Sequence, residues 1–271
     1  MLIEAGKLKK YSMKALDDEL GSIDDFIFES DTFKIRYVVA DTRKWFIGGQ
    51  VLLRMAAFEE LDFIEKTLTV NLTKEQIKNS PKPEDHEPFS RSFEKRLNDH
   101  YGWDHYWLHA PGAIPTGTGP SFVGRTAYTP ATPPMRELDK TSIGADENET
   151  TSTTEEPTLQ SFDHLNKFHI HAKNGQVGQL VDCIMNYDTS EIRYFIVNVG
   201  GFLSKDLVVV SVDMLKEISH LDRTITVSIE KELIENGPNY NADQPFTREH
   251  EEQIYRHYDI TPYWEMSSST K

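Results

Sequence analysis

The sequence predicts a mainly β protein built from two similar small β-barrels in tandem, each followed by a short helix. An internal repeat is the first observation behind this prediction, because Ile35-Arg36-Tyr37 returns as Ile192-Arg193-Tyr194, an offset of 157 residues (192 minus 35). Other pairs share this offset with no gap: Gly21 with Gly178, Asp31-Thr32 with Asp188-Thr189, Pro81 with Pro238, and Tyr106-Trp107 with Tyr263-Trp264. Self-similarity at one fixed spacing indicates two copies of one folded unit.

Short segments with alternating apolar residues are the second observation. In the first copy, two β-rich segments joined by turn residues predict a hairpin over residues 19–37. The segment 33–40 alternates and predicts a half-buried strand with Phe33, Ile35, Tyr37 and Val39 on one face. Residues 50–54 and 66–72 predict two more short strands. Short, regularly spaced strands with no long helix between them are typical of a small barrel or sandwich.

Helix signals follow the last strand of each copy. Thr73 can cap a single helical turn, and Ser90 can cap a longer helix. The apolar stripe of that longer helix consists of Phe93, Leu97 and Tyr101. Thr247 can cap the equivalent helix in the second copy. We therefore expect a helical extension after each barrel.

An abrupt change of composition between the copies is the third observation. Residues 108–160 are rich in Pro, Gly, Thr and acidic residues and contain few apolar ones. Such a segment cannot bury enough apolar surface to offset the entropy lost on ordering. We therefore divide the chain into a first repeat with its helical extension, residues 1–107, a low-complexity linker, residues 108–160, and a second repeat with its extension, residues 161–271.

Composition narrows the function class. The formal net charge is −15, from 29 Lys and Arg against 44 Asp and Glu, and such an acidic surface repels phosphate backbones. No stretch approaches the roughly 18 apolar residues that span a bilayer. The single cysteine, Cys183, cannot form an internal disulfide and is interpreted as a small buried hydrophobe. We expect a cytoplasmic protein that binds no nucleic acid and does not insert into a membrane.

Comparison of the two copies serves as an internal control. A residue kept in both at the common offset is most simply required by the shared fold, and we interpret His100 and His257 in this way. Function is then expected where the copies differ. The basic run Lys7-Leu8-Lys9-Lys10 is interpreted as a solvated leader.

Four features of both copies carry a resemblance to a known family. They are a glycine-containing first hairpin, the Ile-Arg-Tyr strand, an apolar strand before an acidic loop, and a Thr-x-Thr-Val strand at residues 67–70 and 224–227. This pattern resembles the PRC-barrel, named after the cytoplasmic part of the photosynthetic reaction centre H subunit and also found in a ribosome maturation factor. The resemblance covers approximately residues 8–107 and 165–264. It implies two small all-β barrels used as an adaptor in a bacterial stand-alone protein, with no catalytic residues to carry over.

Ten histidines raise the question of a metal site. His169 and His171 alternate on a predicted strand and would project both imidazoles to one face. The first copy has Ser12 and Lys14 at these positions, and no Cys, Asp or Glu completes a recognised ligand spacing. We therefore predict no metal and no cofactor, and name His169 and His171 as the candidate ligands if a metal binds.

No residue pattern typical of nucleophilic or acid/base catalysis stands out, so we predict that the protein is not an enzyme. The favoured hypothesis is a non-enzymatic adaptor or regulator that binds an unidentified protein partner. Its candidate contacts are Trp45, Trp103 and His105, which the second copy does not repeat as Trp or His; ordinary core packing is their alternative role. The second hypothesis is a small-molecule or metal-binding regulator that uses the cleft between the barrels. Homo-oligomerisation stays open.

Overall fold

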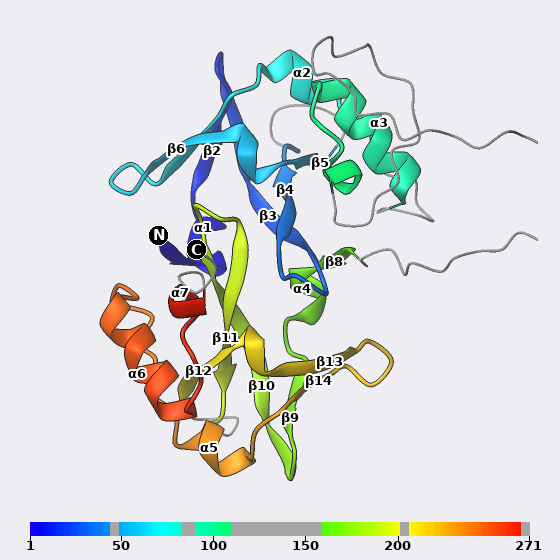
Figure 1. The fold of residues 1–271 in the computed structure, drawn as a ribbon. Coiled ribbons are helices and arrows are strands. Elements are labelled where there is room, and N and C mark those ends of the chain that lie inside the picture. Colours follow the sequence, from blue (N-terminus) through cyan, green and yellow to red (C-terminus); the bar gives the residue numbers. More distant parts are fainter. Residues whose placement is uncertain (44–48, 83–89, 110–158, 201–205, 267–271) are drawn as a thin grey trace, which may run out of the picture. The chain divides into compact units, whose positions relative to one another are not determined.

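The computed structural model describes residues 1–43, 49–82, 90–109, 159–200 and 206–266 (Figure 1). By compactness, Met1–Trp103 and Pro157–Lys271 belong to one unit and Asp104–Glu156 to another. Most of the predicted linker, residues 108–160, lies outside the described residues. The predicted domain bounds therefore stay a prediction.

Each repeat forms one seven-stranded sheet, six strands of which are its own. In the first repeat these strands are β2 (Ser12–Lys14), β3 (Glu19–Glu29), β4 (Ile35–Asp41), β5 (Gln50–Leu53), β6 (Phe58–Asp62) and β7 (Thr67–Val70). In the second repeat they are β9 (His169–Ala172), β10 (Gly175–Asn186), β11 (Glu191–Asn198), β12 (Leu207–Ser211), β13 (Leu215–Ser219) and β14 (Thr224–Val227). The strand orders, β5-β4-β3-β2-β7-β6 and β12-β11-β10-β9-β14-β13, are equivalent.

Short helices connect and follow these strands. The first repeat has the 3-10 helix η1 (Met55–Ala57), α2 (Lys74–Lys78) and α3 (Arg91–Tyr101), and the second has η3 (Val212–Met214), α5 (Lys231–Glu235), α6 (Arg248–Tyr258) and α7 (Tyr263–Met266). The 3-10 helix η2 (Tyr106–His109) belongs to the other compact unit. Thr73 caps α2 through a capping box, and the Ser90 hydroxyl accepts from the Phe93 amide at the start of α3. The predicted mainly β fold, with two similar tandem units and a short helix after each, is confirmed.

Strand β4 is buried on both faces, so the prediction of a half-buried strand was wrong. One set of its side chains packs in the large core: Ile35, Val38 and Ala40. Another set, Tyr37 and Val39, packs with Phe93 and Leu97 of α3. The helical extension therefore covers the face of β4 that would otherwise meet water, and this burial depends on residues more than 50 positions away.

The first strand of each repeat pairs with the sheet of the other repeat. Strand β1 (Leu2–Glu4) pairs antiparallel with β10, with Leu2 opposite Asn186. Strand β8 (Leu159–Ser161) pairs antiparallel with β3, with Leu159 opposite Glu29. The offset of 157 converts one pairing into the other, because it relates residue 2 to 159 and residue 29 to 186. The exchange is therefore reciprocal, and a pseudo-twofold operation relates the two repeats.

Strands β4 and β11 meet at the centre of this symmetry. The Ile35 N–H donates to the Ser190 carbonyl at 2.7 Å, and the Ile192 N–H donates to the Phe33 carbonyl at 2.9 Å. Each bond is the equivalent of the other at the offset of 157. Between them, Lys34 and Glu191 form an antiparallel bridge of equivalent residues. The two repeats are thus joined directly as well as through the exchanged strands.

An aspartate of the other repeat, buried at Asp25 and partly buried at Asp182, holds each exchanged segment in place. Strand β1 leads into α1 (Ala5–Leu8), and β8 leads into α4 (Phe162–Leu165). The Asp182 carboxylate accepts from the Gly6 N–H at 3.1 Å, and Asp25, its equivalent, accepts from the Asp163 N–H at 2.9 Å. A Cβ on Gly6 would lie 2.4 Å from the Asp182 carboxylate oxygen, so a larger residue would require the Asp182 side chain to shift. Each short helix therefore docks on an acidic side chain of the other repeat.

The run Lys7–Lys10 belongs to this docked segment, so its interpretation as a solvated leader was wrong. Leu8 is 1% exposed and lies in the large core. Lys9 forms an ion pair with Asp163 of the second repeat. Leu8, the apolar residue within the basic run, anchors the segment in the core. The charge of the run alone does not reveal this anchor.

The Asp182 carboxyl makes the stability of the exchange depend on pH. Burial raises the pKa of Asp182 to about 6, with Glu4 adding to the rise and the Cys183 and Gly6 amides and Lys9 opposing it. Because this folded-state pKa lies above the usual aspartate value of 3.8, the proton bound by Asp182 stabilises the fold fully below about pH 4. That contribution is lost as pH rises through 6.

We therefore expect the free energy of unfolding of the wild type, minus that of Asp182→Asn, to fall by up to about 3 kcal/mol between pH 4 and pH 7. Urea unfolding at a series of pH values measures this difference. Asp31→Asn, at an exposed position, is the matched control and should show a nearly constant difference. A constant difference for Asp182→Asn as well would contradict the assignment.

Candidate functional site

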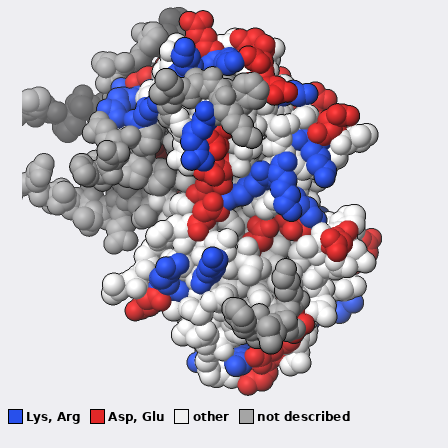
Figure 2. Space-filling view, turned by 180° about the vertical axis from the view of Figure 1, so that it is seen from behind, with Lys and Arg blue, Asp and Glu red and all other residues white. Residues whose placement is uncertain are grey.

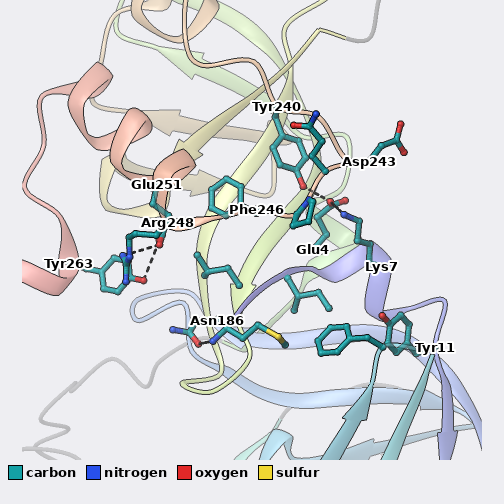
Figure 3. A pocket seen from close by; sticks show the side chains of 16 residues that line it. Glu4, Lys7, Tyr11, Asn186, Tyr240, Asp243, Phe246, Arg248, Glu251 and Tyr263 are labelled. Carbon is teal, nitrogen blue, oxygen red and sulfur yellow. Dashed lines mark hydrogen bonds and ion pairs between the residues drawn. The ribbon is translucent and has the colours of Figure 1, made fainter. Parts of the chain in front are cut away.

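A groove of about 650 Å³ lies where the amino-terminal segment of the first repeat meets the second repeat. From the first repeat, Met1 to Glu4, Lys7, Tyr11 and Phe63 line it. From the second repeat, Asn186, Tyr240, residues 243–246, Arg248, Glu251 and Tyr263 line it. Figure 3 shows Tyr11 and Phe246 on different sides, with Glu4 and Tyr240 close together. The exchange of β1 creates this groove, because it brings residues 1–7 against the second repeat.

Glu4 anchors the inner wall of the groove. This side chain is only 8% exposed, accepts a hydrogen bond from the Tyr240 hydroxyl and forms an ion pair with Lys7 at 2.6 Å. Burial, and then the hydrogen bond to Glu4, raises the pKa of Tyr240 above its usual range. Tyr240 therefore stays protonated and donates to Glu4 throughout the physiological range. The interaction fixes the loop of the second repeat against α1.

A second acidic side chain, Glu251, lies at the other end of the groove (Figure 3). Glu251 is 2% exposed and accepts from the Tyr194 hydroxyl at 2.7 Å and the Tyr263 hydroxyl at 3.2 Å. Arg248 forms an ion pair with it at 2.9 Å, and the Arg248 guanidinium lies 3.8 Å from the Trp264 ring centroid. The buried charge of Glu251 is therefore compensated within the chain.

The Glu251 cluster has an equivalent in the first repeat. Tyr37 donates to Glu94 at 2.9 Å, and Arg91 bonds to Glu94 at 3.0 Å. These three residues correspond to Tyr194, Glu251 and Arg248 at the offset of 157. In each copy the cluster joins the C-terminal helix to the central strand of the barrel, which is a structural role. The Glu251 side of the groove is therefore a rigid part of the fold.

The repeated histidines have a structural role of the same kind. His100 Nε2 lies 2.8 Å from the Gln76 carbonyl oxygen, and His257 Nε2 lies 2.7 Å from the Leu233 carbonyl oxygen. Each ring thereby joins the longer helix to the short helix before it. This geometry agrees with the interpretation that a residue kept in both copies serves the shared fold.

Of the predicted interaction residues, Trp103 does not line the groove. Trp45 lies outside the described residues. Trp103 is partly buried and stacks on Tyr101 with ring centroids 4.2 Å apart, and the Arg54 guanidinium lies 5.4 Å from its centroid. His105 lies in the other compact unit, with its ring centroid 4.9 Å from that of Trp107. The packing of Trp103 agrees with the alternative role in the core, and partner contact by these residues stays a prediction.

Among the described residues, His169 and His171 are not joined by a third side chain that could complete a metal site. His169 and His171 lie on β9, where His169 Nδ1 is 2.7 Å from Gln176 Nε2. In the described part of the chain, no group of three or more His, Cys, Asp and Glu side chains is placed to hold a metal ion. Cys183 is 1% exposed, and burial raises the pKa of its thiol well above the usual value. This supports its interpretation as a packed hydrophobe.

Two exposed aliphatic side chains at hairpin tips were missed by sequence analysis. Ile64, between β6 and β7, is 90% exposed, and Leu221, between β13 and β14, is 93% exposed. They are equivalent at the offset of 157, and apolar residues are uncommon in turns. An aliphatic residue at the same turn position of both copies was therefore a signal that the sequence contained. The groove residues share no single signal of this kind. Phe246 and Tyr263 recur as Phe89 and Tyr106 in the other copy, whereas Glu4 and Tyr240 stand opposite Ser161 and Pro83.

Basic and acidic side chains are mixed over the visible face of the protein. Figure 2 shows Lys and Arg next to Asp and Glu, with neither sign covering that face alone. None of the helices in the described ranges is long and apolar enough to cross a membrane.

Comparison with known families agrees with the fold. The family model of the PRC-barrel domain matches residues 14–77 and 170–234. The chain is a tandem PRC-barrel protein. The matches run from β2 to α2 and from β9 to α5, which confirms the resemblance inferred from the sequence. A search of curated proteins finds no match to the chain.

The groove lies mostly outside the two PRC-barrel matches. Of the residues that line it, only Phe63 and Asn186 fall within the matched segments. The exchanged strands β1 and β8 and the longer helices α3 and α6 also lie outside them. The groove is therefore built from the additions that this chain makes to the two barrels.

The Glu251 cluster predicts a large difference between two neighbouring acidic positions. Glu251→Ala should lower the free energy of unfolding by about 2–4 kcal/mol, because it leaves the buried Tyr194 hydroxyl without its acceptor and Arg248 without its ion pair. Glu252→Ala, at an exposed position of the same helix, should change it by less than about 0.5 kcal/mol. Chemical denaturation measures both. Equal effects would show that the cluster does not hold α6.

Proposed function

We propose that this PRC-barrel protein is a non-enzymatic adaptor or regulator that binds a protein partner in the groove between its amino-terminal segment and its second repeat. The observation that carries the proposal is the aromatic groove of about 650 Å³ formed by both repeats. PRC-barrel domains are not a known enzyme family, and the groove lies mostly outside the matched barrels. A partner would thus mainly contact segments outside the two barrel domains.

The lining supports a protein partner by its chemistry. Tyr11, Tyr240, Phe246 and Tyr263 contribute rings to the groove, and Phe63 is 51% exposed at its edge. Aromatic side chains are enriched at protein interfaces and supply much of their binding energy. The buried acids Glu4 and Glu251 are already satisfied by partners within the chain, so they fix the shape of the groove.

A second candidate function is a regulator that binds a small molecule or a metal in the same cleft. The groove volume favours the small molecule, because ligand pockets typically measure about 300–1,000 Å³. For the metal, the described residues offer no cluster of three ligands. Native mass spectrometry of the purified full chain separates these functions, because a retained small molecule or metal adds a defined mass.

The test is capture of partners from the native host with the tagged full chain and two serine variants. Phe63→Ser changes the edge of the groove at a half-exposed position, so the fold should be retained. Leu221→Ser, at the tip of the equivalent hairpin and outside the groove, is the matched control. We expect one stoichiometric protein with the wild type and Leu221→Ser, and at least about tenfold less with Phe63→Ser, a loss of about 1.4 kcal/mol.

Two results would contradict this proposal. Equal recovery of the same protein by all three forms would place the contact outside the groove. Recovery of no protein, together with a bound small molecule that Phe63→Ser releases, would favour the regulator.

A further inference from the structure

Strand β1 has one edge that pairs with no other described strand. It pairs with β10 without a register shift, and the Tyr187 N–H donates to the Met1 carbonyl at 2.8 Å. Backbone groups of an antiparallel strand point alternately to its two sides. Because the backbone groups of Met1 and Ile3 face β10, the N–H and C=O of Leu2 face the opposite edge.

This free edge forms a wall of the groove. All three residues of β1, together with Met1, line it. Rings of Tyr240 and Phe246 line it from the second repeat, and Tyr11 lines it from the first. The groove therefore offers backbone hydrogen-bonding groups beside aromatic side chains, which is the combination used in recognition of an added strand.

We propose that β1 binds an extended peptide segment of the partner, which adds to the sheet of the second repeat as a further β-strand. The inference rests on the proposed function and specifies the form of the bound segment. Leu2 supplies one donor and one acceptor, and alternate side chains of the segment, apolar or aromatic, pack on Tyr11 and Phe246. A helical segment does not fit this role, because its own backbone bonds occupy the groups that Leu2 requires.

The dimensions limit the length of the contact. Three residues of β1 extend about 10 Å, at about 3.3 Å per residue. The paired part of the bound segment is therefore about three to five residues long, and its flanking residues contact the rim. The ion pair of Glu4 with Lys7 and its hydrogen bond with Tyr240 hold the end of β1 at the start of α1, so the edge is preformed.

The test uses peptides selected from a random 12-residue phage library on the intact chain. A selected peptide, labelled and blocked at both ends, is measured by fluorescence anisotropy. Each of its backbone amides is then N-methylated in turn. We expect methylation of one amide, the one whose N–H donates to the Leu2 carbonyl, to weaken binding about tenfold or more, because Leu2 supplies a single acceptor at this edge. Methylation at the two adjacent positions, whose N–H groups face away from β1, should change it less than about threefold, and these positions are the matched control.

Phe63→Ser and Leu221→Ser distinguish this inference from the proposed function. Binding that Phe63→Ser weakens, but that shows no such position-specific effect of methylation, would overturn strand addition and leave a groove that binds proteins through side chains. Binding that neither variant changes would overturn both. Failure to select any peptide would overturn strand addition, whereas the adaptor function is then decided by partner capture.

Discussion

The reciprocal pairing of β1 with β10 and of β8 with β3 is the constraint on which the rest of this structure depends. A three-residue strand contributes little stability alone, but each exchanged strand continues into a helix docked on an aspartate of the other repeat. The central hydrogen bonds of Ile35 and Ile192 complete the connection. The two barrels therefore cannot separate without exposing core residues such as Leu8 and Leu165, both essentially fully buried. The internal repeat of the sequence thus corresponds to one compact unit at the level of packing.

Departures from the pseudo-twofold symmetry explain why the groove forms beside β1. At the end of β8, Ser161 donates to the nearby Asp25 and caps α4. Its equivalent at the end of β1 is Glu4, whose longer side chain reaches Lys7 and Tyr240. Ser161 thus bonds to the aspartate on which its own segment docks. Glu4 instead bonds to Lys7 and to Tyr240, and so connects its segment to a loop of the second repeat. Two copies of one fold supply the frame. The candidate site combines residues that the copies share, such as Phe246 and Tyr263, with residues in which they differ, such as Glu4 and Tyr240.

The sequence was sufficient for the features that depend on local patterns. The repeat offset, the alternation of residues 67–70 and the caps at Thr73 and Ser90 all predict elements that the structure contains. The exchange could not be predicted, because β1 and β8 share only Leu2 and Leu159 and their partners lie far along the chain. The burial of both faces of β4, and the groove, depend on the same kind of long-range contact. Choosing tryptophans that the second copy does not repeat led to Trp103, which is packed, and to Trp45, which lies outside the described residues. A residue that differs between the copies can also serve packing.

The most direct test of the exchange is an NMR measurement on the intact chain. In antiparallel strands, the Hα atoms of opposed residues that do not exchange hydrogen bonds lie close together. The account predicts strong Hα–Hα nuclear Overhauser effects between Leu2 and Asn186, and between Leu159 and Glu29, both of which arise within one molecule. A sample that mixes isotope-labelled and unlabelled chains separates contacts within a chain from contacts between chains. Absence of both effects, or their appearance only between chains, would contradict an exchange within one molecule.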